Sequence, residues 1–188
     1  MIRFLCLYFK YILEKLINFR TISFHGFTVV FAYPGSSIFL LGKRHKKITI
    51  NSSPLSNLVG MSQRTIIVAR NGGKIEIGAG CGISGSTIYA MEKIRIGEDV
   101  LIGANCKIVD NDFHPLSVEK RNPQRVEDIK KKPIEIGDGC FIGTNSIILK
   151  GTILGSNCVV GAGSVVCGSF PDNVIIAGNP AKIIKKNM

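Results

Sequence analysis

The side chains with the widest chemical range in this 188-residue sequence are three histidines and six cysteines. His114 stands in the segment Asp-Asn-Asp-Phe-His-Pro (110–115), directly before a long polar stretch. Because an imidazole titrates near ambient pH, His114 is a candidate for proton transfer; a solvent-exposed loop histidine is the alternative. Asp110 and Asp112 could fix the tautomer of its ring, or either could simply belong to the turn.

The other candidate groups point away from metal and redox chemistry. No pair of cysteines has the CxxC spacing, and reduced thiols suit the cytoplasm. A zinc lyase would need several histidines close together. His25 and His45 lie in a weakly patterned part of the chain, far in sequence from His114. We therefore predict no metal site.

The elements that position His114 follow a period of six. Aliphatic residues recur at steps of six from Ile136 to Val166: Ile136, Ile142, Ile148, Leu154, Val160 and Val166. A helix would require a period of 3.6 and a simple strand a period of 2. Six is the period of a parallel β-helix, in which three hexapeptides close one coil and coils stack about 4.8 Å apart. The sequence therefore predicts an all-β solenoid whose aliphatic residues point inward, with a glycine often following at a tight corner.

Small residues occupy a second periodic position, four residues after each aliphatic one. They are Cys81, Thr87, Cys106, Cys140, Ser146, Thr152, Cys158 and Ser164. We expect all of them to point inward. Since a buried free cysteine behaves as a small hydrophobic residue, packing is the predicted role of these four cysteines.

Two segments depart from the repeat. Residues 113–133 form a long polar interruption, and such loops inside compact arrays commonly carry function. Residues 1–22 are predicted as an amphipathic helix, followed by the β-helix domain at 23–188, whose coils are weaker at 47–76. The helix could cap the open end of the solenoid, or residues 1–20 could make weak peripheral contact with an anionic membrane.

Charge is distributed unevenly. The net charge is +11, and the first 70 residues hold ten Lys and Arg against one acid. Such asymmetry suits an anionic membrane face or a phosphorylated substrate. Nucleic acid is not expected, because stacking motifs and recognition-helix signatures are missing.

The longest early apolar run, Phe4–Phe9, is far shorter than the roughly 18 residues of a membrane span. A cytoplasmic protein is expected, with peripheral contact at the inner membrane face as the alternative.

Three stretches resemble the hexapeptide-repeat acyltransferases: IRIGEDVLIGANCKIVDNDFHP (94–115), IEIGDGCFIGTNSIILKGTILGSNCVVGAGSVV (134–166) and the tail IIAGNPAKIIKK. The likeness covers about residues 71–186 and is greatest to the maltose, galactoside and polysaccharide O-acetyltransferase branch. It implies a left-handed parallel β-helix, a homotrimer, acetyl-CoA as acyl donor without a metal, and direct transfer in a ternary complex. In that family the histidine of this motif is the general base, here His114.

The resemblance also implies cofactor-binding positions. Thr144 and Ala162 would act mainly through backbone groups, and Phe141 stands where relatives often have a tryptophan beside the cofactor. Lys182 and Lys185 match basic residues that face the CoA phosphates. Packing of Phe141 in the wall and solvation of the basic tail are the alternatives.

One departure concerns the acceptor. Galactoside-type members carry a substrate-binding asparagine about thirty residues before the histidine, whereas this chain has Ile83, Ser84, Gly85 and Ser86 there. We expect Ser84 and Ser86 to contact the acceptor. The predicted activity is O-acetylation of a sugar hydroxyl in a cell-surface polysaccharide or its precursor. N-acetylation of an amino sugar nucleotide and a non-catalytic β-helix scaffold remain alternatives.

Overall fold

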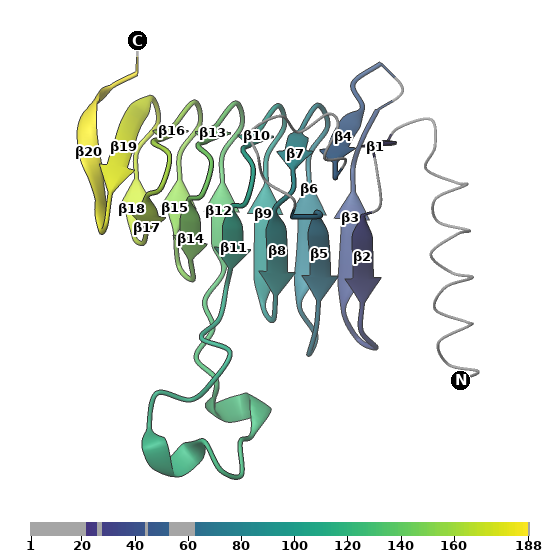
Figure 1. Ribbon diagram of the computed structural model, residues 1–188, viewed down its shortest axis with the longest axis vertical. Coiled ribbons are helices and arrows are strands. Elements are labelled where there is room, and N and C mark those ends of the chain that lie inside the picture. Colours follow the sequence, from purple (N-terminus) through teal and green to yellow (C-terminus); the bar gives the residue numbers. More distant parts are fainter. Residues whose placement is uncertain (1–21, 26–27, 44, 53–62, 188) are drawn as a thin grey trace.

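The computed structural model describes residues 22–25, 28–43, 45–52 and 63–187. In this part of the chain, strands wind into a prism with three parallel sheets as its faces, and a long loop projects from one edge (Figure 1). The parallel β-helix predicted from the six-residue period is confirmed.

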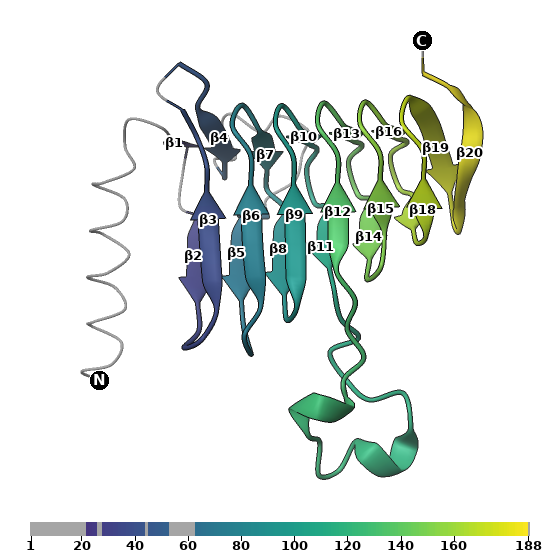
Figure 2. The same cartoon turned by 180° about the vertical axis from the view of Figure 1, so that it is seen from behind.

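Each sheet takes one strand from each successive coil. Sheet A contains β1 (Ile22–His25), β4 (Ile48–Asn51), β7 (Gly82–Ser84), β10 (Leu101–Ile102), β13 (Phe141–Ile142), β16 (Val159–Val160), β19 (Val174–Gly178) and β20 (Ala181–Lys186). Sheet B contains β2 (Val29–Ala32), β5 (Ile66–Ala69), β8 (Thr87–Ala90), β11 (Lys107–Val109), β14 (Ile147–Leu149) and β17 (Val165–Val166). Sheet C contains β3 (Ser37–Leu40), β6 (Lys74–Ile77), β9 (Lys93–Ile96), β12 (Ile134–Ile136), β15 (Ile153–Leu154) and β18 (Ser169–Phe170). Only β20 is antiparallel to its neighbour among these strands, and it covers the end of sheet A (Figure 2).

The core is a stack of the predicted aliphatic residues. On sheet A, Ile102, Ile142, Val160 and Ile176 are aligned by strand pairing and are all buried. The glycine that follows Ile102, Ile142 and Val160 permits close approach of neighbouring coils, whereas Ala177 follows Ile176 in the last coil. A Cβ at Gly143 would lie 2.5 Å from the backbone nitrogen of Ala162, closer than any side chain tolerates. Crowding between coils is therefore the reason for glycine at this position.

The small inward position is confirmed with one correction. Cys81, Cys106, Cys140 and Cys158 are fully buried, as predicted, and desolvation raises the pKa of Cys140 to about 12. Thr87 was predicted to point inward but is only half-buried, and Ser86 takes its place in the core. The reason is a step of five residues, instead of six, between the inward-facing Ile83 and Ile88.

The predicted loop leaves the corner between sheets B and C and contains two short 3-10 helices, η1 (Val118–Lys120) and η2 (Val126–Asp128). Its neck is a narrow two-stranded ribbon. The N–H of Asp112 donates to the carbonyl oxygen of Lys130 (3.0 Å), and the N–H of Lys132 donates to that of Asp110 (2.9 Å). On either side of this insertion β11 still pairs with β8 and β14, and β12 with β9 and β15.

The boundary of the predicted N-terminal helix, residues 1–22, is corrected at its last residue. Ile22 was placed in the predicted helix 1–22, but it is the first residue of β1. The remainder of that helix, and with it the capping and membrane hypotheses, lies outside the described residues. Among the helices that the structure describes, none is long and apolar enough to cross a membrane.

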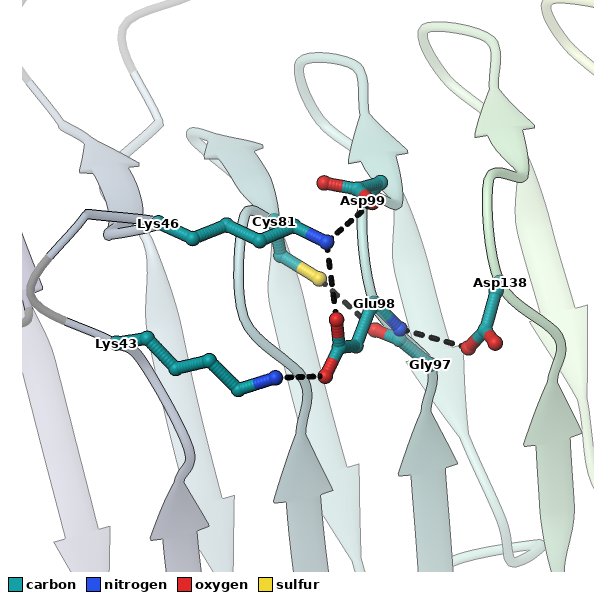
Figure 3. A network of polar contacts seen from close by, with 7 residues as sticks. All are labelled: Lys43, Lys46, Cys81, Gly97, Glu98, Asp99 and Asp138. Carbon is teal, nitrogen blue, oxygen red and sulfur yellow. Dashed lines mark hydrogen bonds and ion pairs between the residues drawn. The ribbon is translucent and has the colours of Figure 1, made fainter.

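A cluster of ion pairs ties the turn between β3 and β4 to the middle of the prism (Figure 3). Lys43 Nζ lies 2.7 Å from Glu98 Oε1, and Lys46 Nζ lies 2.9 Å from Glu98 Oε2 and 2.5 Å from Asp99 Oδ2. Hydrogen bonds from Lys43 and Lys46 lower the pKa of Glu98 to about 2. The cluster fastens the first coils to the repeat.

This cluster predicts a pH dependence of stability. The folded-state pKa of Glu98 lies below its ordinary value of 4.5, so its stabilising effect is present above about pH 4.5 and is lost as the pH falls towards about 2. We expect E98Q to lose part of the acid sensitivity that the wild-type protein shows in this window, measured as unfolding midpoints across the range. Glu135→Gln serves as the control, since the exposed Glu135 makes no ion pair with any described residue. Equal acid sensitivity of E98Q and wild type would contradict the prediction.

Candidate active site

His114 is exposed at the start of the loop, where a tight turn sets its backbone. The N–H of His114 donates to the carbonyl oxygen of Asp112 (2.7 Å), and the N–H of Phe113 donates to Asn111 Oδ1 (2.9 Å). Phe113 has a φ of 60°, and its ring centroid lies 5.0 Å from that of Tyr89. Every other described non-glycine residue with positive φ is Asn or Asp. A bulky side chain in this conformation indicates strain held by its surroundings, which is a mark of functional sites.

Neither predicted carboxylate orients the imidazole. Asp110 is fully buried, and its two oxygens accept the N–H groups of Met91 and Glu92 at 2.8 Å. Asp112 is paired with Lys150. Both aspartates therefore hold the base of the loop, and the proposed role in fixing the tautomer is corrected.

The ring instead contacts a residue that no sequence pattern singled out. Nδ1 of His114 lies 2.7 Å from Oε1 of Gln124, on the returning half of the loop. Gln124 belongs to no repeat or recognisable motif, so its place beside His114 could be found only from the fold of the loop.

A second group of predicted residues gathers along the outer surface of sheet A. Strand pairing places Phe141 beside Leu101 on one side and Val159 on the other, and continues to Ile175 and Lys185. Phe141 is 47% exposed, so its ring is not buried by packing in the wall of the prism. The result is an apolar row that ends at a lysine.

The corner beside this row carries the remaining predicted cofactor residues. Thr144 and Ala162 occupy equivalent places one coil apart, where the N–H of Gly163 donates to the carbonyl oxygen of Thr144 (2.8 Å). Lys182 is paired with Ala177 at the same edge of sheet A. The structure thus brings Phe141, Thr144, Ala162, Lys182 and Lys185 to one side of the prism.

The two serines expected to contact the acceptor differ from each other. Ser84 is half-buried at the end of β7. Ser86 is fully buried; its hydroxyl donates to the carbonyl oxygen of Gly103 (2.7 Å) and accepts the N–H of Cys106 (2.9 Å). A hydroxyl used in this way inside the core has no surface for an acceptor, so the prediction for Ser86 was wrong.

Within a single chain, His114 and the predicted cofactor residues lie at different places. The loop with His114 leaves the corner between sheets B and C, whereas Thr144 and Ala162 lie at the corner between sheets A and B. In Figure 1 the loop extends downward from β11 and β12, whereas β10, β13 and β16 lie near the top of the prism. Among the described residues no three His, Cys, Asp or Glu side chains gather as they would around a metal ion.

Comparison with known proteins agrees with this architecture. The family model described as "Hexapeptide repeat of succinyl-transferase" matches residues 93–109 and 133–167. WbbJ of Escherichia coli (strain K12), assigned by its name to O-acetyl transfer in lipopolysaccharide biosynthesis, is 40% identical over 104 residues, or 53% of each chain. The chain thus spans about half the length of the curated relatives it matches.

Two solved structures share the fold over most of the chain. A maltose O-acetyltransferase from Clostridium difficile 630 has a TM-score of 0.59 at 29% identity, covering 82% of this chain and 70% of its own. A galactoside acetyltransferase in complex with coenzyme A has a TM-score of 0.53 at 25% identity, covering 93% and 70%. The solenoid is thus a left-handed parallel β-helix. The chain therefore carries the hexapeptide repeat over residues 93–109 and 133–167 and shares the fold of these acetyltransferases.

Proposed function

We propose that the chain is an acetyl-CoA-dependent O-acetyltransferase that modifies a sugar hydroxyl of a cell-surface polysaccharide or its precursor. The observation that carries the proposal is the alignment of Phe141, Thr144, Ala162, Lys182 and Lys185 on one side of the prism. An apolar row ending in lysines suits a long donor with an apolar arm and a phosphorylated end. The named activity of WbbJ supports a glycan as the acceptor.

In the proposed reaction His114 is the general base. Its imidazole takes the proton from the sugar hydroxyl as the oxygen attacks the thioester carbon. A C–O bond forms, the C–S bond breaks, and the proton passes from His114 to the departing CoA sulfur. Backbone N–H groups at the corner of Thr144 and Ala162 would stabilise the negative charge that develops on the thioester oxygen.

This proposal requires more than one chain, because His114 and the donor-binding residues lie at different corners. We propose a homotrimer in which the loop 113–133 of one chain reaches the corner between sheets A and B of the next. The loop exposes Leu116 (62%) and Val118 (71%), apolar side chains suited to contact with a neighbour. Light scattering at assay concentration should give the mass of three chains; an active monomer would refute the arrangement.

The lysines of β20 give a test of donor binding. We expect the double variant K182A/K185A to weaken CoA binding by roughly 10–100-fold, because two cations near phosphates are removed. Calorimetric titration with CoA at low and high salt would show both the loss and a reduced salt dependence. Lys74→Ala, an exposed lysine on sheet C, is the matched control. Unchanged affinity in the double variant would assign these lysines to a solvated tail.

The activity itself is tested by acceptor screening. The purified protein is mixed with acetyl-CoA and either hydroxy-sugar or amino-sugar acceptors, with thiol release and product mass as readouts. Acetyl transfer to a hydroxyl supports the proposal, whereas transfer only to an amine would assign N-acetylation. Absence of CoA binding in a direct titration would instead indicate a non-catalytic scaffold.

A further inference from the structure

The side-chain amide of Gln124 makes two hydrogen bonds that together determine its orientation. Its Nε2 lies 3.1 Å from the carbonyl oxygen of Phe113, to which it donates. Its Oε1 therefore faces the imidazole, 2.7 Å from Nδ1 of His114. With the amide rotated the other way, Oε1 would face the carbonyl oxygen of Phe113, and two acceptors would be in contact.

The orientation of the amide decides the tautomer of the histidine. An amide oxygen only accepts hydrogen bonds, so Nδ1 of His114 must carry the proton. The lone pair then resides on Nε2, on the other side of the ring. We propose that Gln124 is a positioning residue that holds His114 in the Nδ1–H tautomer and presents Nε2 as the basic atom. The inference rests on the proposed function for its catalytic meaning, while the tautomer is a property of the protein alone.

Further contacts between the two halves of the loop stabilise the hydrogen bond between His114 and Gln124. Arg121 donates from Nε to the carbonyl oxygen of Pro115 (3.0 Å) and from Nη2 to that of Leu116 (2.8 Å). A backbone bridge joins Arg121 and Gln124. The returning half of the loop thus holds the segment after His114 through Arg121, and the imidazole through Gln124.

An amide differs from a carboxylate in this place. Both accept from Nδ1–H, but a carboxylate also stabilises the imidazolium ion and would keep the ring protonated up to higher pH. Of the charged groups beside this turn, Asp112 is paired with Lys150 through one carboxylate oxygen, and Arg121 donates to the two carbonyl oxygens. Gln124 therefore selects the tautomer without adding a charge beside the base.

The tautomer is tested directly by ¹⁵N NMR of the full-length protein labelled at histidine. His114 is identified as the ring signal that disappears in H114N, since the chain has only three histidines. Wild-type protein should show protonated Nδ1 and unprotonated Nε2 at His114 above neutral pH, and Q124A should show a mixture of tautomers. Retention of the pure Nδ1–H form in Q124A would overturn the proposal, whether or not an acceptor has been found.

Kinetics provide the second readout once transfer is measurable. Q124A should lower kcat by on the order of 10–100-fold, the usual cost of removing a partner that orients a working histidine, with CoA affinity unchanged. Q124E should recover much of that loss at high pH while the acidic limb of its pH–rate profile moves upward. Ser117→Ala, which removes another side-chain hydrogen bond of the same loop, should leave both readouts unaltered. A Q124E profile identical to wild type would show that Gln124 acts only on loop structure.

Discussion

Replacement of His114 by alanine is expected to lower turnover by roughly 10²–10⁴-fold while the affinity for CoA stays nearly unchanged. The sugar hydroxyl is a poor nucleophile, and the other two described histidines, His25 and His45, lie in the first coils, far in sequence from the loop. Since the residues proposed to bind the donor lie at a different corner of the prism, removal of the imidazole leaves their surface intact. Steady-state kinetics and calorimetric titration with CoA measure the two effects separately.

His45→Ala is the matched control, because His45 is also exposed but lies far from the loop in sequence. It should retain wild-type turnover. If H114A also turned over at a nearly normal rate, His114 would be excluded as the base, and the role of the loop would have to be sought in acceptor contacts alone.

Asp110→Ala should destabilise the protein by about 3–5 kcal/mol, the largest stability change expected from a polar substitution in the described core. The variant leaves the buried N–H of Met91 and the partly buried N–H of Glu92 without their carboxylate acceptor. Hydrogen bonds to a charged group contribute about 1.5–3 kcal/mol each, and buried donors left unpaired add a desolvation cost. Urea unfolding followed by circular dichroism gives the difference in the free energy of unfolding.

Two controls separate this effect from the loss of any carboxylate. Asp110→Asn keeps one acceptor oxygen and should cost clearly less than D110A. Asp138→Ala removes a carboxylate that accepts a single N–H, from Glu98 at 2.8 Å on the exposed corner, and should cost least. Equal destabilisation by all three variants would show that the buried position of Asp110 is unimportant.

The fold was predictable because aliphatic residues and glycines recur with a period of six in the sequence. Isoleucine and valine fill the interior and glycine marks places where coils approach closely, so both core and corners could be named. The period fails wherever one coil is a residue shorter, as between Ile83 and Ile88. There it misplaced Thr87, and it could not show that the hydroxyl of Ser86 is used inside the core.

The candidate site was predictable only on its regular side. The resemblance to known acyltransferases singled out Phe141, Thr144 and Ala162, and because they lie in the repeat, counting residues places them on a common surface. The irregular loop has no such rule: Gln124 is ten residues from His114 and meets it only because the chain reverses direction. Nearness in sequence favoured Asp110 as a partner of the ring, but burial commits its carboxylate to the backbone.

The loop is an insertion that does not change how neighbouring coils pair. Strand β11 pairs with β14, and β9 pairs with β12, as they would without the insertion. The loop is joined to the prism by its narrow neck and by the contact of Phe113 with Tyr89. Length and composition beyond the neck, apart from His114 and Gln124, can therefore change while the strand pairing under Phe141, Thr144 and Ala162 is kept. On the proposed function, acceptor choice and donor binding are separable properties of one chain. Exchange of residues 113–129 between relatives could then redirect the enzyme to another glycan while its use of CoA is kept.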